Sequence, residues 1–283
     1  QTRYSLSASR HKMEQAIAAL PDNHPGRARF RNEIANIDQA AQTGAAALLA
    51  RFPGRQLSRV PHTALEFSEA RAGDLALLFS DGSRQPISVK TDKTGRLAVA
   101  EGQTHDLGAK WAARYFQVDD TALDTMRAEL GVASDAELKA HYLNVAQLAA
   151  RVIMRALDLH DCQPHDFSRA RVGNLAAVKY LFRQLLRYKH GNDDSVVIAL
   201  DRATGRVKWE SRLDAVDIDQ LDAARISFTP ARPRRGNPVS STFGIRIDGR
   251  TVVTFQIKHK RGKAGQTALR QEFSDITTRL AID

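Results

Sequence analysis

Apolar positions recur at two different periods along this chain. In residues 9–20 and 27–51 they return at helical intervals, and Ala, Leu, Glu, Gln and Arg are abundant, which predicts two helices. Pro21 and Pro25 separate these two segments. Residues 106–190 repeat the helical spacing, and we therefore expect this part of the chain to be largely helical.

Strand patterns lie between the two helical regions. Asp74–Phe79 is mostly apolar, which predicts a strand buried on both faces. Residues 80–85 supply turn residues, and Ile87–Lys90 is the returning strand of a hairpin. Residues 62–67 predict an earlier strand, whereas residues 95–100 either continue the sheet or begin a loop.

The period changes again after residue 194, where turns alternate with short apolar runs. Five strands are predicted there: 195–200, 206–211, 225–230, 242–247 and 251–260. The order of elements predicts an α+β fold with a mixed β-sheet flanked by helices and a β-rich basic C-terminal part. We expect three parts, which can also form one continuous domain: residues 1–105 with the first helices and the hairpin, 106–192, and 193–283.

Positive charge is gathered near the C-terminus. Lys and Arg number 42 against 32 acidic residues, a net charge of +10. Residues 225–263 contain ten basic residues and one acidic residue, Asp248, so they carry +9 of this charge. Such a concentration indicates a surface for a polyanion, with nucleic acid first among the classes. The alternative is a solubilising face.

Composition excludes several other classes of protein. No apolar stretch approaches the roughly 18 residues of a membrane span, and residues 1–15 have no apolar signal-peptide core. Cys162 is the single cysteine, which excludes an internal disulfide and a cysteine-based zinc site. We expect this thiol to be packed or half-buried, and we expect a cytoplasmic protein without a membrane partner.

The hairpin carries candidate chemistry at one end. Its turn brings Asp74 about opposite Lys90 or one pair beyond it, and Ser88 shares a face with Lys90. Asp74 and the backbone carbonyl near Val89 can bind Mg²⁺, a hard cation that prefers oxygen ligands. Lys90 can orient a water molecule or stabilise charge on a phosphate. The alternative is that Asp74 and Lys90 are solvated strand ends.

The stretch GDLALLFSDGSRQPISVKTDKTG resembles the core motif of the PD-(D/E)xK nucleases, in particular the type II restriction endonucleases. That motif is an Asp, an apolar strand, a turn, and then an acidic residue, any residue and Lys. The match covers about residues 66–95. The resemblance implies Mg²⁺-dependent hydrolysis of double-stranded DNA at a specific site, with Asp74 and Lys90 catalytic.

The chain departs from this motif at two positions. Gly73 replaces the proline before Asp74, which varies in the family. Ser88 stands where Asp or Glu is usual, and a serine cannot supply a negatively charged metal ligand. A carboxylate from elsewhere must then complete the site, and the number of metal ions stays open. The candidates are Glu66, Glu33, Glu101 and Asp106, of which the first two rank highest.

The basic segment, taken with this resemblance, predicts DNA contacts and a dimer. The residues expected to contact DNA are Lys93, Arg96, Arg232, Arg234, Arg235, Lys258, Lys260, Arg261 and Lys263. Restriction sites are usually palindromic, so a homodimer is expected on DNA. A cognate DNA methyltransferase is expected in the same system. Two alternatives stay open: a DNA-binding protein without catalysis, and a repair or recombination nuclease of the same fold.

A second sequence match competes with the hairpin. Asp248, Gln256 and Lys258 imitate the spacing of an Asp, a polar residue and Lys. Asp248-Gly249 is a turn dipeptide, however, so we expect Asp248 at a hairpin tip, away from Lys258. Lys258 is expected to face phosphates instead.

Overall fold

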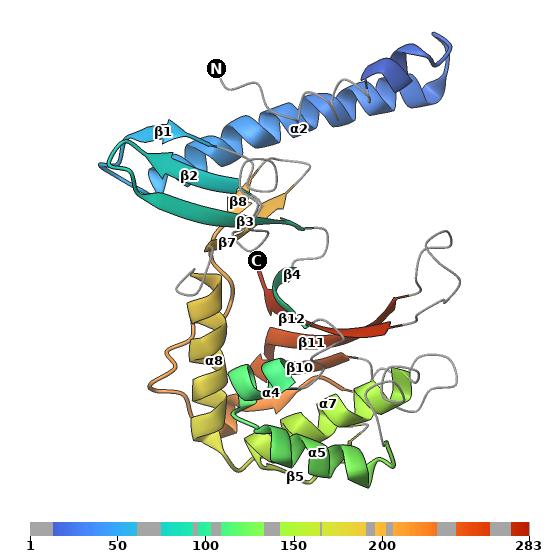
Figure 1. The fold of residues 1–283 in the computed structure, drawn as a ribbon, viewed down its shortest axis with the longest axis vertical. Coiled ribbons are helices and arrows are strands. Elements are labelled where there is room, and N and C mark those ends of the chain that lie inside the picture. Colours follow the sequence, from blue (N-terminus) through green and yellow to red (C-terminus); the bar gives the residue numbers. More distant parts are fainter. Residues whose placement is uncertain are drawn as a thin grey trace. The chain divides into compact units, whose positions relative to one another are not determined.

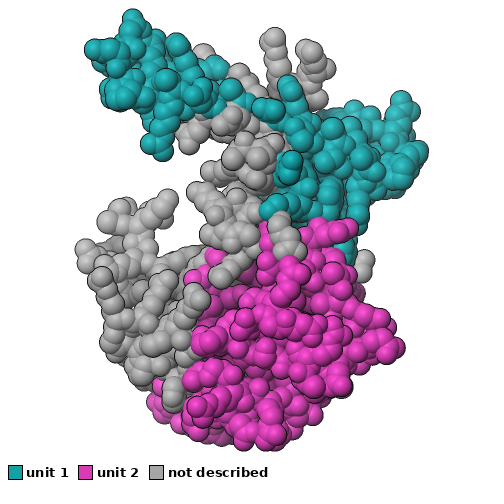
Figure 2. All heavy atoms as spheres, turned by 180° about the vertical axis from the view of Figure 1, so that it is seen from behind, with its two compact units in different colours: residues 1–97, 188–209 teal, residues 98–187, 210–283 magenta. Residues whose placement is uncertain are grey.

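The structure is a computed structural model (Figure 1). It describes residues 14–60, 75–92, 96–102, 109–132, 142–164, 166–190, 196–201, 206–230, 242–260 and 273–282. The chain forms two compact units, coloured in Figure 2. Unit 1 comprises residues 1–97 and 188–209, and unit 2 comprises residues 98–187 and 210–283. Helices and mixed sheets together confirm the predicted α+β class.

None of the helices in the described ranges has both the length and the apolar character needed to cross a membrane.

Helix α2 (Pro25–Ala50) is the long helix of unit 1. The prediction placed its start at residue 27, but Pro25 belongs to its first turn, where the missing N–H has no intrahelical partner to lose. The His24 imidazole caps this end, because its Nδ1 accepts a hydrogen bond from the Gly26 N–H at 3.1 Å. Of the other predicted helix, residues 14–18 are helical.

Five strands form the sheet of unit 1, in the order β1-β2-β3-β7-β8. Their bounds are Leu57–Arg59 for β1, Leu75–Phe79 for β2, Arg84–Asp92 for β3, Val196–Asp201 for β7 and Val207–Lys208 for β8. The pairs β1–β2, β2–β3 and β7–β8 are antiparallel, and β3–β7 is parallel, so the sheet is mixed. The pattern did not predict β1, and the strand predicted at 62–67 lies outside the described residues.

Apolar residues cover both faces of this sheet. On one face Leu77, Ile87 and Ile198 belong to a buried cluster that includes Leu48 of α2. On the other face Ala76, Val197 and Ala199 are at most 2% exposed. Strand β2 is therefore buried on both faces, as its sequence predicts.

The hairpin turn is shorter than the sequence indicates. Asp81 accepts a hydrogen bond from the Ser83 N–H at 2.8 Å, and the Phe79 N–H donates to the Ser83 carbonyl at 3.0 Å. Gly82 adopts φ +79, which costs little without a Cβ. Strand β3 therefore starts at Arg84, three residues before the predicted start.

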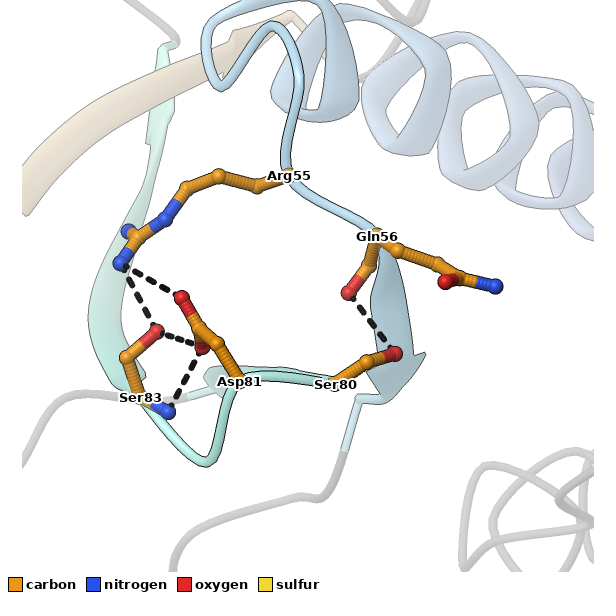
Figure 3. A network of polar contacts seen from close by, with 5 residues as sticks. All are labelled: Arg55, Gln56, Ser80, Asp81 and Ser83. Carbon is orange, nitrogen blue, oxygen red and sulfur yellow. Dashed lines mark hydrogen bonds and ion pairs between the residues drawn. The ribbon is translucent and has the colours of Figure 1, made fainter.

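A polar network ties this turn to the loop after α2 (Figure 3). The Arg55 guanidinium donates to the Ser83 hydroxyl at 2.8 Å and lies 3.6 Å from the Asp81 carboxylate. The Ser80 hydroxyl donates to the Gln56 carbonyl at 3.3 Å. The network therefore fixes the hairpin against the segment that leads into β1.

A second five-stranded sheet, in the order β4-β12-β11-β10-β9, belongs to unit 2 apart from Arg96 and Leu97, the first two residues of β4. Its strands are β4 (Arg96–Gly102), β9 (Ile226–Phe228), β10 (Thr242–Ile247), β11 (Arg250–Lys260) and β12 (Phe273–Ala281). The segment at 95–100 thus joins this sheet rather than extending that of the hairpin. Strand β12 was not predicted.

Helices and a small hairpin complete unit 2. They are α4 (Ala109–Phe116), α5 (Asp120–Glu129), α7 (Tyr142–Leu157), β5 (Leu159–His160), β6 (Arg171–Val172), α8 (Leu175–Lys189) and the short helix η2 (Ala223–Arg225). The rings of Trp111 and Phe116 in α4 lie 5.8 and 5.6 Å from that of Phe255 in β11. The last two residues of α8 belong to unit 1.

The turn network predicts an acid-dependent contribution to stability. The side-chain and backbone hydrogen bonds from Ser83, with Arg55 nearby, hold the pKa of Asp81 below its ordinary value. Its contribution is therefore present above the unfolded pKa of about 3.9 and is lost as pH falls through the lower folded value. Asp81→Asn should lower the melting temperature at pH 7, and the difference should shrink as the pH falls below about 3.9 and through the lower folded pKa.

Thermal melts of both proteins from neutral to acid pH measure this difference. Asp124→Asn, on the exposed side of α5, removes the same charge elsewhere and serves as the control. A difference between wild type and Asp81→Asn that stays constant or grows on acidification contradicts the assignment.

Candidate functional site

Lys90 lies inside a strand, not at its end. Strand β3 continues to Asp92 because a parallel ladder with β7 supplies partners for all of its last six residues. Lys90 pairs with Ala199, and its side chain is partly buried. Ser88, two residues earlier, is 9% exposed. The prediction that the strand stops at Lys90 is therefore wrong, and Lys90 is not a freely solvated strand end.

The hairpin register differs from the expected one by two residues. Leu75 pairs with Ile87, whereas an Asp74–Lys90 pair requires Leu75 opposite Val89. The shorter turn accounts for this difference. Side chains alternate between the two faces of a strand, so a shift of two residues keeps Ser88 and Lys90 on the same face. The first residue of β2, Leu75, now pairs with Ile87, the residue before Ser88.

Several predicted site residues lie outside the described residues, namely Asp74, Glu66, Asp106, Lys93, Arg232, Arg234, Arg235, Arg261 and Lys263. Glu33 belongs to α2, fifteen residues or about 22 Å before Leu48 at the α-helical rise. Since Leu48 packs in the cluster with Ile87, the structure does not bring Glu33 to Ser88. Glu101 and Arg96 belong to β4, in the other sheet.

Two aspartates that were not predicted from the sequence meet at the end of the parallel ladder. Asp92 and Asp201 are register partners, two residues beyond the Lys90–Ala199 pair. Ligands of open sheets bind at the carboxyl ends of parallel strands. An aspartate that directly follows an apolar run, as Asp201 does, is the signal that identifies such a position, but only once the pairing of β3 with β7 is known.

Metal-binding side chains are sparse in the described ranges. No three His, Cys, Asp or Glu side chains gather there in an arrangement that can hold a metal ion. The expected ligand Asp74 lies outside these ranges, and Val89 contributes a backbone carbonyl rather than a side chain.

The competing Asp248 has a structural role. It lies in the tight turn between β10 and β11 with φ +49, as the dipeptide predicts. The Arg225 guanidinium donates to both of its carboxylate oxygens, at 2.6 to 3.2 Å. This bond lowers the pKa of Asp248. Lys258 pairs with Asp275 in the ladder with β12, far along the strand from the turn.

Two arginines at the turn end of the unit 2 sheet hold specific partners. At the turn end, Arg225 binds Asp248, and the Arg246 guanidinium donates to the Gly249 carbonyl at 2.8 Å. At the opposite end, β10 begins at Thr242 and its antiparallel neighbour β11 ends at Lys260.

The most basic sequence segments join the sheet at this opposite end. Residues 231–241 precede β10 and residues 261–272 follow β11, and both lie outside the described residues. These two segments contain Arg232, Arg234, Arg235, Arg261 and Lys263, and Lys258 and Lys260 lie in the last three residues of β11.

Cys162 does not have the properties of a nucleophile. Burial, with Asp161 and Asp166 nearby, raises the pKa of its thiol. The thiol is partly buried, as expected, and is protonated at neutral pH.

Comparison with known protein families, with curated proteins and with solved structures finds no match to this chain.

The structural role of Asp248 is tested through its ion pair with Arg225. Asp248→Asn and Arg225→Gln should each lower the melting temperature, and the double variant should lose less than the two decreases combined, because each variant removes the same bond. The Asp248 contribution is present above its unfolded pKa and is lost on acidification through its lower folded pKa. Additive decreases at pH 7 would show that the bond is absent in solution.

Proposed function

We propose that this chain is a sequence-specific, Mg²⁺-dependent endonuclease that hydrolyses phosphodiester bonds of double-stranded DNA. The observation that carries the proposal is the position of Lys90, partly buried inside β3 and two residues from the buried Ser88. A lysine that is partly buried in a sheet can pack its aliphatic stem against its neighbours and keep its ammonium accessible to a ligand. Lys90 also stands where the resemblance to PD-(D/E)xK nucleases requires the catalytic lysine.

The chemistry of the residues fits a hard cation. Ser88 offers a hydroxyl, Val89 a carbonyl, and Asp74, Asp92 and Asp201 are carboxylate residues of the same hairpin and ladder. Oxygen donors of this kind bind Mg²⁺. Bound there, Mg²⁺ supplies Lewis-acid polarisation of the phosphate and a water molecule of lowered pKa. Asp92 and Asp201 join Glu66 as candidates for the carboxylate that Ser88 does not supply.

Lys90 acts on the substrate in this proposal. Its ammonium donates to a non-bridging oxygen of the scissile phosphate and stabilises the negative charge that grows there. Partial burial strengthens this interaction, because fewer water molecules screen the charge.

The basic end of unit 2 is proposed as the DNA-contacting surface. In the sequence, seven of the ten basic residues of the 225–263 segment lie in the last three residues of β11 or in the segments that precede β10 and follow β11, whereas Arg225 and Arg246 bind partners at the turn end. Lysine and arginine side chains that neutralise phosphates supply the non-specific part of DNA affinity. Lys93 and Arg96 are proposed as further contacts.

The partners follow from the same proposal. A palindromic site is most simply bound by a two-fold homodimer. Self-protection requires a cognate DNA methyltransferase in the same system, and both proteins act in the cytoplasm. Ser88 in place of an acidic residue favours one second candidate, a DNA-binding protein without catalysis. A repair or recombination nuclease of the same fold is the other alternative.

Substitutions in the hairpin test catalysis. Asp74→Ala and Lys90→Ala should each lower cleavage of phage DNA about 10²-fold or more, the usual cost of losing a charge-stabilising group, while melting and DNA binding persist. Ser88→Ala should be milder, because serine is not a charged ligand. Arg84→Ala, an exposed substitution in the same strand, is the control. Cleavage at the wild-type rate by Lys90→Ala would place the site elsewhere.

Salt titrations test the basic end. Lys258→Ala/Lys260→Ala and Arg234→Ala/Arg235→Ala should weaken binding to specific and random DNA and reduce the salt slope by about one for each phosphate that the variant no longer neutralises. Loss of a residue that contacts a base edge should instead weaken binding by about 1–3 kcal/mol and relax specificity at one base pair. Arg225→Gln, at the other end of the sheet, should leave the slope unchanged. If both double variants keep the wild-type affinity and salt slope, the basic segment is only a solvated face.

A further inference from the structure

Helix α8 carries a buried lysine. The buried stripe of this helix consists of Val178, Leu181, Phe182 and Leu185, each with no exposed surface, and Lys189 follows one turn later with only 1% exposed. These positions recur at helical spacing. Lys189 therefore occupies a place that the pattern reserves for an apolar side chain.

A buried lysine depends on its partners. Its ammonium gives up hydration that a buried environment returns only through specific partners. Lys189 takes part in an interaction, so its charge is not isolated. Buried charged groups occur at functional sites and also in structural ion-pair networks.

One row of backbone pairs connects the end of α8 to the hairpin. His190 forms an antiparallel bridge with Val196, the first residue of β7. Val196 pairs with Ile87 in the parallel ladder, and Ile87 pairs with Leu75 in the antiparallel one. All four residues belong to unit 1.

Lys189 lies one residue from this row, on the side of Ser88. Because the bridge at His190 is antiparallel, the step back to Lys189 runs in the same direction as the step forward from Ile87 to Ser88. Two strand spacings, about 10 Å, separate the two backbones. The four-carbon stem of a lysine can cross most of that distance.

We propose that Lys189 is a positioning residue of the cleavage site, whose ammonium donates a hydrogen bond to the Ser88 hydroxyl and fixes it beside Lys90. This inference rests on the proposed function. It also gives a reason for serine at this position. An acidic residue there would neutralise Lys189, whereas a hydroxyl accepts its hydrogen bond and leaves two positive charges, on Lys90 and Lys189, to attract a phosphodiester.

A double-mutant cycle between Lys189 and Ser88 tests the contact without DNA. Lys189→Met, Ser88→Ala and the double variant are compared with wild type in thermal melts. If the two side chains interact, the double variant should melt no lower than the less stable single variant. Lys179→Met is the matched control, because this lysine of the same helix donates to the Asp219 carbonyl instead, at 2.7 Å. Its decrease should add to that of Ser88→Ala.

Additive decreases for Lys189→Met and Ser88→Ala would overturn the inference. If Lys189→Met does not fold, Lys189→Leu replaces it in the same cycle with Ser88→Ala, because leucine also lacks the donor, and additivity there has the same meaning. A lysine that only caps the end of α8 would give additivity in both cycles.

Cleavage kinetics show whether the contact matters for catalysis. Lys189→Met should lower kcat about tenfold or more with KM unchanged, the size of effect usual for groups that orient a catalytic residue. Lys189→Arg should restore most of this loss, and Lys179→Met should match wild type. Unchanged kcat in a folded Lys189→Met variant contradicts the positioning role. If wild type itself does not cleave, the proposed function fails, and the melting cycle still decides the contact.

Discussion

The parallel ladder between β3 and β7 is the interaction on which the candidate site depends. It joins segments that are more than a hundred residues apart in the sequence, and it pairs every residue from Ile87 to Asp92. Without β7, Lys90 would lie at the exposed end of a hairpin. With it, Lys90 becomes an interior residue of the central strand, and Asp92 and Asp201 become neighbours.

The rest of unit 1 supports this ladder. The end of α2 and the buried cluster around Leu77 and Ile87 cover one face of the sheet, which makes the position of β3 costly to change. The network of Arg55, Asp81 and Ser83 fixes the turn from which β3 starts. Pro86 is tolerated because it precedes the ladder with β7, where β3 has only β2 as a partner.

Local patterns predicted the elements well and their partners poorly. The apolar run of β2 and the Asp248-Gly249 turn follow from nearest neighbours in the sequence, and both are found. The register of the hairpin was missed by two residues, because the Asp81 side chain closes a tighter turn than composition indicates. Nothing local to β7 indicates that it pairs with β3, so Asp92, Asp201 and Lys189 did not stand out. The residues most needed for the proposed metal site, above all Asp74, lie outside the described ranges.

The proposed cleavage of DNA at a specific sequence is tested most directly by the sequences at the ends of the fragments. Phage DNA is incubated with the wild-type protein in Mg²⁺ and, in parallel, in EDTA, and the fragment ends are sequenced. We predict discrete fragments in Mg²⁺ alone, whose ends all carry one short palindromic sequence. Ends of random sequence, equal cutting in EDTA, or intact DNA with Mg²⁺, Mn²⁺ and Co²⁺ would contradict the claim.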